Sequence, residues 1–511
     1  MNLLRALATV SSLTMVSRVL GYVRDFFIAR VFGASLLTDA FFVAFKIPNL
    51  LRRMFAEGAF SQAFVPILAE HKNRNPQEVK GLIDRVATLL ALALALTAAL
   101  GVAVAPLIVY VTAPGFAADP GKFELTVALL RITFPYIFFI SLVALAAGIL
   151  NTWSRFAVPA ITPALLNVSF IVGAAFFAGY FDPPVLVLAW AVFVGGVLQL
   201  GFQIPYLLKL NLLPRWRIDL HHPGVRRVLF LMVPAAFGVS VTQVSLLINQ
   251  IFASFLPTGS VSWLYYADRL MELPAGVLGV ALGTILLPSL SKTHADADSA
   301  EYSRLLDWGL RMTVLLALPA AAALAVLALP LIATLFQYGR FGAEDAAMTR
   351  QALVAYSAGL LGLILVKILA PGFYARQDVK TPVKIGLWTL LATQAMNFAF
   401  VGSLKHAGLA LAIGLGACLN AGLLYWLLRK RNIYEPQAGW LAFLLKVLAA
   451  VAFMAVVLFT TMGEASWWLV APWYQRVAAT AGLVVLGTAA YAGCLLAFGL
   501  RPRDFARRAA A

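Results

Sequence analysis

The chain has 511 residues, of which 62% are hydrophobic and 12% are charged, and its formal net charge at pH 7 is +17. Soluble globular proteins carry about 25% charged residues, so this composition excludes an ordinary soluble domain and indicates a polytopic membrane protein. The positive charge does not indicate nucleic-acid binding, because it is concentrated in alternate connections between apolar segments.

Apolar blocks fill nearly the whole sequence, and about fourteen of them are long enough to cross a bilayer. We therefore predict an all-α polytopic membrane protein with about fourteen transmembrane helices. Arg5 precedes the first block, as in a signal peptide, but Arg18 and Arg24 interrupt that block, so we predict an uncleaved first helix. Cys418 and Cys494 lie within apolar blocks and offer neither a disulfide framework nor metal-ligand spacing.

Basic residues are unevenly distributed between the connections. With the N-terminus inside, the even-numbered connections and the C-terminal tail hold about 25 of the 39 Lys and Arg residues. The odd-numbered connections hold about five, among them Lys122, Arg340, Lys405 and Arg476. This bias predicts that both termini lie in the cytoplasm.

Four arginines lie in the first two apolar stretches: Arg18, Arg24, Arg52 and Arg53. A guanidinium near the middle of a bilayer costs roughly 2.5–3.5 kcal/mol, so we do not expect these side chains on a lipid-facing surface. We expect them to line a water-filled or ligand-filled cavity between helices. A cationic cavity inside a membrane predicts a transporter for an anionic cargo.

In the first helix, Arg18 and Asp25 are seven residues apart and share a face. Gly21 lies between Arg18 and Arg24, and a bend there would turn both arginines toward one cavity. The alternative is a structural ion pair, in which Arg24 binds Asp25 or Asp39.

In the second helix, Pro48 predicts a kink whose freed carbonyls require a cavity beside them. Arg52 lies three residues after Asn49 on the same face, so we favour Arg52 over Arg53 as the side chain that faces the cavity. We expect Arg53 to extend toward the cytoplasmic interface.

The sequence repeats itself at a nearly constant offset. The segment around Pro66 resembles that around Pro288, and the segment around Gly148 resembles that around Gly372. Two echoes at nearly the same spacing indicate a duplication with both halves in the same orientation. We predict a six-helix lobe over residues 1–218, a second over residues 219–432, and two appended helices with a basic cytoplasmic tail over residues 433–511.

In the second half, Arg269 and Glu272 are three residues apart and are expected to pair. This pair is either a neutralised structural contact or one that exchanges partners when the cavity changes side. The sequence contains no Walker-type loop, nucleophile–base triad or histidine cluster, so we predict a transporter and not an enzyme. The nearest carboxylates for a metal-dependent lipid-diphosphate enzyme are Asp296, Asp298 and Glu301, which are typical of a solvated loop.

Several segments carry distinctive motifs: Ser17-Arg18 to Gly21, Arg24-Asp25, Thr38-Asp39, Lys46-Ile47-Pro48-Asn49-Leu50-Leu51-Arg52-Arg53, Phe55 to Pro66 with Glu57, Trp263-Leu264-Tyr265-Tyr266-Ala267-Asp268-Arg269, and Phe373 to Pro382. Through these segments, residues 1–440 resemble the MurJ (MviN) family of lipid II flippases. The resemblance implies the fold of the multidrug/oligosaccharidyl-lipid/polysaccharide exporter superfamily, with two six-helix lobes around a central cavity plus two C-terminal helices.

The resemblance also implies a function in cell-wall synthesis. The cargo would be lipid II, the undecaprenyl-diphosphate-linked precursor of peptidoglycan, moved across the bacterial cytoplasmic membrane from the inner to the outer leaflet by alternating access. Its motifs assign substrate binding to Arg18, Arg24, Arg52 and Arg269, and place Asp39 and Glu272 as acidic cavity residues, to which we add Asp25. The appended helices would hold the polyprenyl tail, and Lys446 stands where some relatives have arginine.

Two alternative functions remain: a flippase for another polyprenyl-linked oligosaccharide, and a cation-coupled drug exporter of the same superfamily. The arginine-rich first lobe disfavours the exporter, because cationic drugs need an acidic cavity. We expect no cofactor, coupling to the membrane potential or to a monovalent cation, membrane lipids as surroundings, and a monomer.

Overall fold

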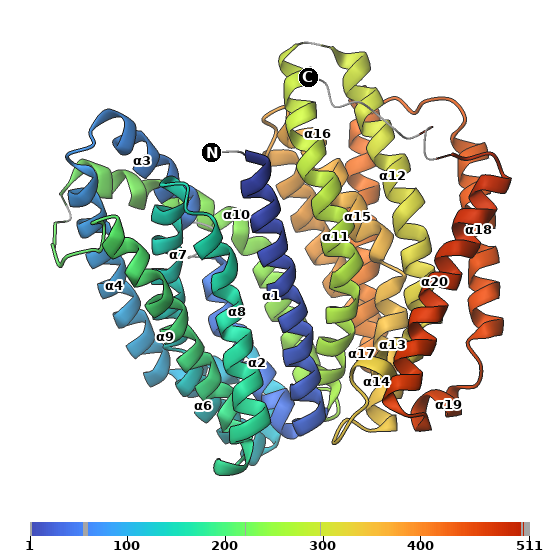
Figure 1. The fold of residues 1–511 in the computed structure, drawn as a ribbon, viewed down its shortest axis with the longest axis horizontal. Helices are drawn as coiled ribbons and strands as arrows, with labels where there is room; N and C mark the ends of the chain where they lie inside the picture. The colour runs from blue at the N-terminus through green and yellow to red at the C-terminus, as the bar shows by residue number, and fades with distance from the viewer. Residues whose placement is uncertain (1–2, 55–59, 220, 297, 502–503, 505–511) are drawn as a thin grey trace. The chain divides into compact units, whose positions relative to one another are not determined.

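The computed structural model describes residues 3–54, 60–219, 221–296, 298–501 and 504 (Figure 1). These residues form helices joined by short connections, and none of them lies in a β-strand. Ten of the helices are long and apolar enough to cross a membrane. The predicted all-α membrane fold is confirmed, while the count of about fourteen spans stays a prediction.

Contacts divide the chain into two units, of which unit 1 is Met1–Ser262 and unit 2 is Trp263–Ala511. Helix α10 (Pro223–Ser254) belongs to unit 1, since it packs against α3 (Ser61–Arg74), α4 (Val79–Ala103) and α5 (Ala105–Thr112). The predicted boundary between residues 218 and 219 separates the two sequence repeats, which is a different division from that of the contact-based units. It stays a prediction.

Unit 1 is built on pairs of packed helices, with α1 against α8, α8 against α9, α2 against α6, and α7 against α9. Its apolar core includes Phe64, Leu82 and Ile149, all fully buried. The remaining helices are α1 (Leu3–Phe32), α2 (Leu36–Leu51), α6 (Pro120–Thr133), α7 (Tyr136–Thr152), α8 (Ala157–Val172) and α9 (Leu186–Lys209), with short turns η2 (Pro114–Ala118), η3 (Gly173–Phe177) and η4 (Ala178–Tyr180).

Unit 2 contains most of α11 (Ser260–Ala295) and the helices that follow it. Its core is formed by Leu306, Ile368 and Leu428 with their neighbours. In the 51-residue α17, Lys405 has φ 51° and divides it into two helices. The elements are α12 (Ser299–Val326), α13 (Ala328–Leu335), α14 (Ala343–Ser357), α15 (Leu360–Leu369), α16 (Pro371–Tyr374), α17 (Lys380–Lys430), α18 (Trp440–Thr461), α19 (Ala465–Val470) and α20 (Trp473–Ala497).

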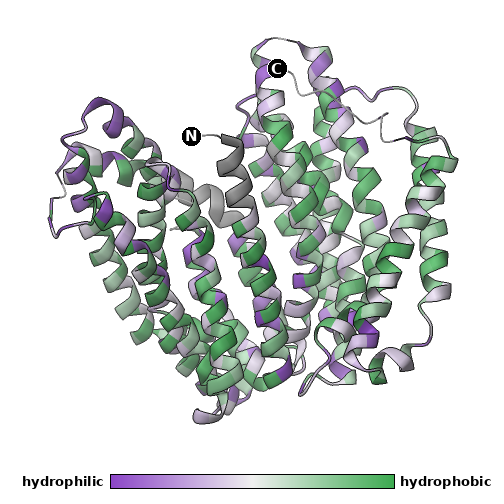
Figure 2. Ribbon diagram, in the orientation of Figure 1, coloured by the Kyte–Doolittle hydropathy of each residue, from purple (hydrophilic) through white to green (hydrophobic). Residues whose placement is uncertain are grey.

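The two C-terminal helices form a pair within unit 2. Helix α18 packs against α20, and the pair contacts the unit through α12 and α13 (Figure 1). Apolar residues make up most of the length of the helices, and hydrophilic residues are frequent at helix ends and connections (Figure 2). This distribution is the one that a lipid surrounding requires.

Helix ends recur at the offset that the sequence repeat predicts. Helix α7 is followed by Ser154 at φ 59°, and α16 by Gln377 at φ 60°, 223 positions later. Helix α9 is followed by Asn211 at φ 56°, and α17 by Asn432 at φ 55°, 221 positions later. Each of these left-handed residues ends its helix in the same way. The recurrence concerns these helix ends, and the division into two six-helix lobes stays a prediction.

Candidate functional site

Arg24 is a buried cation in the first helix. Its Nε and Nη2 atoms donate to Oδ1 of Asp25 at 2.9 and 2.7 Å, and its Nη1 donates to Oδ1 of Asn167 on α8 at 3.1 Å. The guanidinium lies 5.4 Å from the ring centroid of Phe170. Arg24 is only 8% exposed and Asp25 is fully buried. The ion pair with Asp25 that the sequence left open is therefore present, and Arg24 does not pair with Asp39.

The other arginine of this helix lies in a different environment. Arg18 is exposed, although it has nearly the same angular position on α1 as the buried Asp25. Helix α1 therefore carries one cation that a ligand can reach, Arg18, and one that is already paired with a carboxylate, Arg24.

Arg52 lies at the C-terminal end of α2, which contains Pro48. Its Nε and Nη2 atoms donate to Oδ1 of Asn49 at 3.0 and 2.8 Å, as their shared face predicts. Arg52 is half-buried and Arg53 is exposed. Asn49 is neutral, so it orients the guanidinium without cancelling its charge. The predicted residue Glu57 lies outside the described residues.

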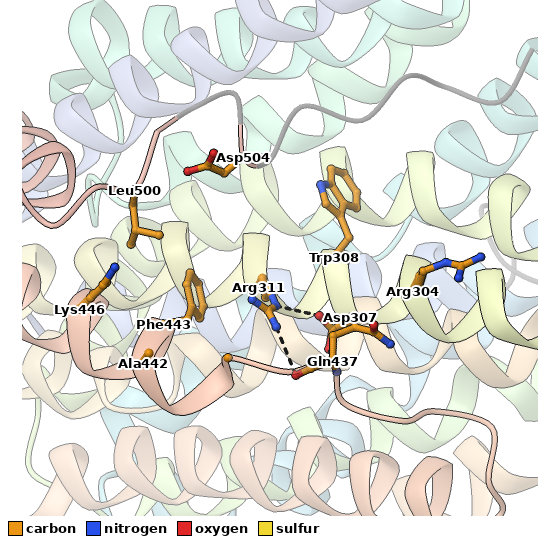
Figure 3. Close-up of a pocket in the computed structure, with 11 residues that line it drawn as sticks. Arg304, Asp307, Trp308, Arg311, Gln437, Ala442, Phe443, Lys446, Leu500 and Asp504 are labelled. Atoms are coloured by element: carbon orange, nitrogen blue, oxygen red, sulfur yellow. Dashed lines mark hydrogen bonds and ion pairs between the residues drawn. The ribbon is translucent and has the colours of Figure 1, made fainter.

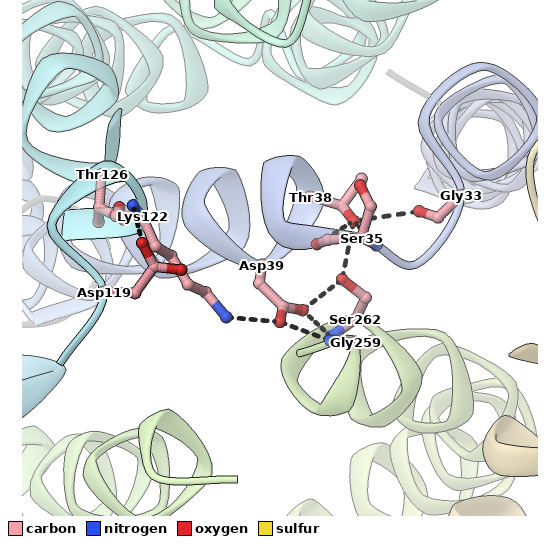
Figure 4. A network of polar contacts seen from close by, with 9 residues as sticks. All are labelled: Gly33, Ser35, Thr38, Asp39, Asp119, Lys122, Thr126, Gly259 and Ser262. Atoms are coloured by element: carbon pink, nitrogen blue, oxygen red, sulfur yellow. Dashed lines mark hydrogen bonds and ion pairs between the residues drawn. The ribbon is translucent and has the colours of Figure 1, made fainter. Parts of the chain in front are cut away.

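Asp39 is the centre of a buried network in unit 1 (Figure 4). Its Oδ2 accepts from Nζ of Lys122 at 3.0 Å and from the backbone N–H of Gly259 at 2.7 Å. Its Oδ1 accepts from the N–H and hydroxyl of Ser262 at 3.0 and 2.7 Å. The ammonium of Lys122 also lies 4.1 Å from the ring centroid of Phe116. Asp39 therefore joins α2, α6 and the first turn of α11.

Two cations that the charge distribution placed in external connections are buried in helices instead. Lys122 is 4% exposed in the first turn of α6, and Arg476 is 6% exposed in the first turn of α20. Nη1 of Arg476 donates to the carbonyl of Ala333 at 2.8 Å and to Oε1 of Gln337 at 3.1 Å. Hydropathy misplaced both residues because a cation at the end of an apolar run resembles a loop residue.

In unit 2, Arg269 and Glu272 form the predicted pair on α11. Nη1 of Arg269 lies 3.0 Å from Oε2 of Glu272, and the two side chains are 30% and 47% exposed. The guanidinium lies 5.8 Å from the ring centroid of Tyr265. Because both partners are accessible, a ligand can replace either of them without first uncovering a buried charge.

A cavity of about 450 Å³ in unit 2 lies beside the start of the C-terminal pair and is lined by Asp307, Arg311, Phe443 and Lys446, among others (Figure 3). Oδ1 of Asp307 accepts from Tyr434 at 2.7 Å, from the N–H of Gln437 at 3.0 Å and from Trp440 at 2.6 Å. Nε of Arg311 donates to Oδ2 of Asp307 at 2.7 Å. Asp307 therefore fixes the connection into α18. Asp307 was not among the residues predicted from the sequence, since nothing in its local pattern distinguishes it.

Among the described residues, no group of three or more His, Cys, Asp or Glu side chains is arranged to hold a metal ion. Several guanidinium groups of the two units donate to carboxylate or amide oxygens, as Arg24 does to Asp25 and Arg52 to Asn49. Such groups bind phosphate oxygens through paired hydrogen bonds.

The family model described as lipid II flippase MurJ matches residues 28–473. A lipid II flippase MurJ from Burkholderia cenocepacia is 54% identical over 100% of both chains. A probable lipid II flippase MurJ from Vibrio cholerae is 42% identical over 98% of this chain and 97% of the relative.

Two solved structures are similar to this chain. A structure described as lipid II flippase MurJ in an inward closed conformation has TM-score 0.81 and 26% identity, and covers 98% of this chain and 99% of that chain. An inward-facing multidrug resistance MATE family transporter of the MOP superfamily has TM-score 0.65 at 15% identity, covering 83% of this chain and 98% of that chain. The second similarity concerns the fold alone.

Proposed function

Because the chain belongs to the lipid II flippase MurJ family, we propose that it translocates lipid II from the inner to the outer leaflet of the bacterial cytoplasmic membrane. Full-length similarity to flippases of this name is the observation that carries the proposal. The chain is a multi-pass inner-membrane protein, and ten helices in the part of the chain that the structure describes are long and apolar enough to span the bilayer. The cargo is the undecaprenyl-diphosphate-linked disaccharide-pentapeptide precursor of peptidoglycan.

Arg24 and Asp25 supply a switchable cation for the diphosphate. A buried guanidinium without a partner is strongly unfavourable, so Asp25 compensates Arg24 while no cargo is bound. A diphosphate oxygen offers the same paired geometry with more negative charge and competes for the guanidinium. The hydrogen bond from Arg24 to Asn167 keeps the side chain oriented during the exchange.

Three further arginines complete the proposed contacts. Arg52 presents a guanidinium that Asn49 orients and does not neutralise. Arg18 is exposed, and Arg269 is paired with the accessible Glu272. All three contact the diphosphate and sugar head group, and Glu272 and Asp39 act as acidic residues that respond when the cavity changes side.

The remaining parts of the proposal concern the cycle. The two lobes alternate access by rocking, and the polyprenyl tail stays along α18 and α20. The cycle is driven either by the membrane potential or by a monovalent cation. The membrane potential supplies about 2.3 kcal/mol per charge per 100 mV. The protein acts as a monomer with both termini in the cytoplasm, without a cofactor and without an enzymatic reaction.

The alternatives differ in their cargo. A flippase for another polyprenyl-linked oligosaccharide needs the same cations, because it too carries a diphosphate. A cation-coupled drug exporter needs an acidic, aromatic cavity, which the arginines of α1 and α2 disfavour.

Arg52 is the cleanest residue for testing the proposal. Arg52→Ala removes a half-buried guanidinium that donates to the neutral amide of Asn49. We expect loss of complementation in a strain depleted of its own flippase, with lipid II accumulating in the inner leaflet and normal protein levels by immunoblot. Arg52→Lys should be impaired, since a point charge replaces a planar fork. Lys430→Ala, at an exposed position, is the control and should complement.

Arg24 needs a paired design, because Arg24→Ala alone removes the guanidinium that Asp25 binds and leaves the Asp25 carboxylate buried. Arg24→Ala/Asp25→Ala removes both charges. If Arg24 binds the cargo, the double variant reaches the membrane but does not complement. Recovery of transport in the double variant would show that Arg24 only neutralises Asp25. Accumulation of a different lipid-linked precursor on depletion would contradict lipid II as the cargo.

A further inference from the structure

The connection between α9 and α10 is fastened to α4 by its backbone. The N–H of Arg215 donates to Oδ1 of Asp84 at 2.9 Å, and the N–H of Arg217 donates to Oγ1 of Thr88 at 2.9 Å. From Arg215 to Arg217 an extended chain advances about 6.6 Å, and from Asp84 to Thr88 a helix advances about 6 Å. Because these two distances match, the connection runs alongside α4 in the same direction. We call residues 213–219 the strap.

The strap turns back at its end, where Asp219 lies 2.9 Å from Nε of Arg85. Between these attachments, Trp216 is 76% exposed and Ile218 is 70% exposed. Arg215 and Arg217 are exposed as well. Successive side chains of an extended segment point to opposite sides, so the two apolar residues share one side and the two arginines the other.

The guanidinium of Arg217 extends toward the N-terminal end of α4. Its Nη1 lies 4.0 Å from the position that a Cβ on Gly81 would occupy, although its backbone is bound to Thr88. Seven helical residues separate Gly81 from Thr88, a distance of about 10 Å along the axis. A basic side chain that extends along a helix toward its end is typical of a residue whose backbone lies within the membrane and whose charged group reaches the aqueous interface.

Beyond the strap, the same row of α4 becomes apolar and exposed. Asp84 and Thr88 are spaced by four residues and are followed at the same spacing by Leu92 and Leu96, which are 43% and 61% exposed. Adjacent members of such a row share a face. The strap therefore covers the polar start of a helix face that continues as an apolar surface.

Unit 2 contains the same arrangement on α12, where helix α18 packs over the apolar face. Asp307 is 223 residues after Asp84, and it accepts from the N–H of Gln437, which follows Pro436 as Arg215 follows Pro214. Leu315, which corresponds to Leu92, packs beside Phe443 and Val447 of α18. The C-terminal helix pair thus covers in unit 2 the face that the described residues of unit 1 leave exposed on α4.

We propose that the strap and this face of α4 bind an anionic phospholipid. Its acyl chain lies along Leu92 and Leu96, Trp216 and Ile218 enter the boundary between head groups and acyl chains, and Arg215 and Arg217 contact the phosphate. Paired cations next to an apolar, aromatic surface are the features that such a lipid requires. The site is independent of the proposed transport activity, because it needs only that the protein lies in a bilayer.

The first test measures where the strap lies. Spin labels are placed at Ile218→Cys and His221→Cys in protein whose Cys418 and Cys494 are replaced by alanine, reconstituted in vesicles of phosphatidylethanolamine and phosphatidylglycerol. We expect the label at 218 to be accessible to oxygen and protected from a water-soluble nickel chelate, and the label at 221 to show the reverse. Accessibility to nickel at 218, or to neither reagent because a second copy covers it, would overturn the proposal.

The second test concerns the head group. Phosphatidylglycerol or phosphatidylcholine is titrated into the detergent-purified protein, and the unfolding temperature is recorded. We expect Arg215→Gln/Arg217→Gln to require roughly 25-fold more phosphatidylglycerol for half of the stabilisation, about five-fold for each guanidinium. Lys380→Gln/Lys384→Gln removes equal charge from exposed residues of α17 and should leave the titration unchanged.

An equal dependence on phosphatidylglycerol in the wild type and the strap variant would overturn the proposal. So would equal stabilisation by phosphatidylcholine, because the site would then not recognise anionic lipid. Soluble glycerol phosphate should have no effect, and stabilisation by it would identify a free-phosphate site in place of a lipid site.

Discussion

At the scale of single residues, the Asp39–Lys122 pair predicts a graded loss of stability. Lys122→Met leaves the Asp39 carboxylate with three donors from Gly259 and Ser262. Asp39→Ala removes the acceptor of the Gly259 and Ser262 N–H groups and of a buried ammonium, so it should be the more destabilising change. Removing one partner of a buried pair costs about 3–5 kcal/mol.

The measurement is the unfolding temperature of each purified variant in detergent, and the expected order is wild type, Lys122→Met, then Asp39→Ala. Arg340→Met is the control, because Arg340 is an exposed cation and its replacement should change stability by less than about 0.5 kcal/mol. An Asp39→Ala protein as stable as Lys122→Met would show that Asp39 does not fix the start of α11.

The polar contacts that the sequence predicted are those between residues close in the chain. Arg269 with Glu272 and Arg52 with Asn49 follow from helical spacing alone. The contact of Lys122 with Asp39 spans 83 positions, and hydropathy locates helices without telling which of them are neighbours. The all-α fold was predictable because a bilayer requires each span to satisfy its own backbone hydrogen bonds.

At the scale of elements, the start of α17 depends on an ionised Asp378. Its Oδ1 accepts from the N–H of Thr381 at 3.0 Å, and its Oδ2 accepts from the hydroxyl of Thr381 at 2.6 Å and from Arg431 at 2.8 Å. Partial burial raises the pKa of Asp378, but these hydrogen bonds outweigh it and hold the pKa below its usual value. The stabilisation is therefore present above pH about 3.9 and is lost as the pH falls through the lowered pKa.

We expect Asp378→Ala to lower stability by about 1 kcal/mol near neutral pH, the usual effect of losing a side-chain acceptor for an N–H in the first turn of a helix. The difference from wild type should narrow below pH about 4, as measured by unfolding temperature across pH. Asp378→Asn keeps an acceptor for Thr381 and should lose less. A difference that stays constant down to pH about 3 would contradict a role for the charged form.

The contact between α15 and α17 predicts a second effect on an element. A Cβ on Gly359 would lie 2.0 Å from the Cα of Gly414, so Gly359→Ala must separate the two backbones. Close approach through small residues is a principal source of helix association in membranes. We expect a loss of about 1–3 kcal/mol, seen as a lower unfolding temperature.

Gly422→Ala is the matched control. Gly422 lies on α17, as Gly414 does, and a Cβ added to it would have no neighbouring atom within 4 Å. It should be neutral or stabilise by up to about 1 kcal/mol, because alanine favours the helix. Equal effects of the two substitutions would show that the α15–α17 contact adapts without cost.

At the scale of the whole molecule, burial of Lys122 and Arg476 sharpens the charge asymmetry of the connections. Neither cation is available to an external aqueous loop, because one binds Asp39 and the other binds carbonyl and amide oxygens near α13. The odd-numbered connections therefore carry still fewer free cations than the sequence count suggested. The positive-inside bias then favours cytoplasmic termini more strongly.

This orientation predicts the labelling of single cysteines in intact cells. Ala118 is exposed in the turn before α6, and His221 is exposed in the connection before α10. With Cys418 and Cys494 replaced by alanine, Ala118→Cys should react with a membrane-impermeant maleimide added outside. His221→Cys should react only after the membrane is permeabilised. The opposite labelling pattern would show that the orientation is reversed. The strap would then meet its lipid in the other leaflet, because α4 begins beside the connection that contains His221 and ends toward the turn that contains Ala118.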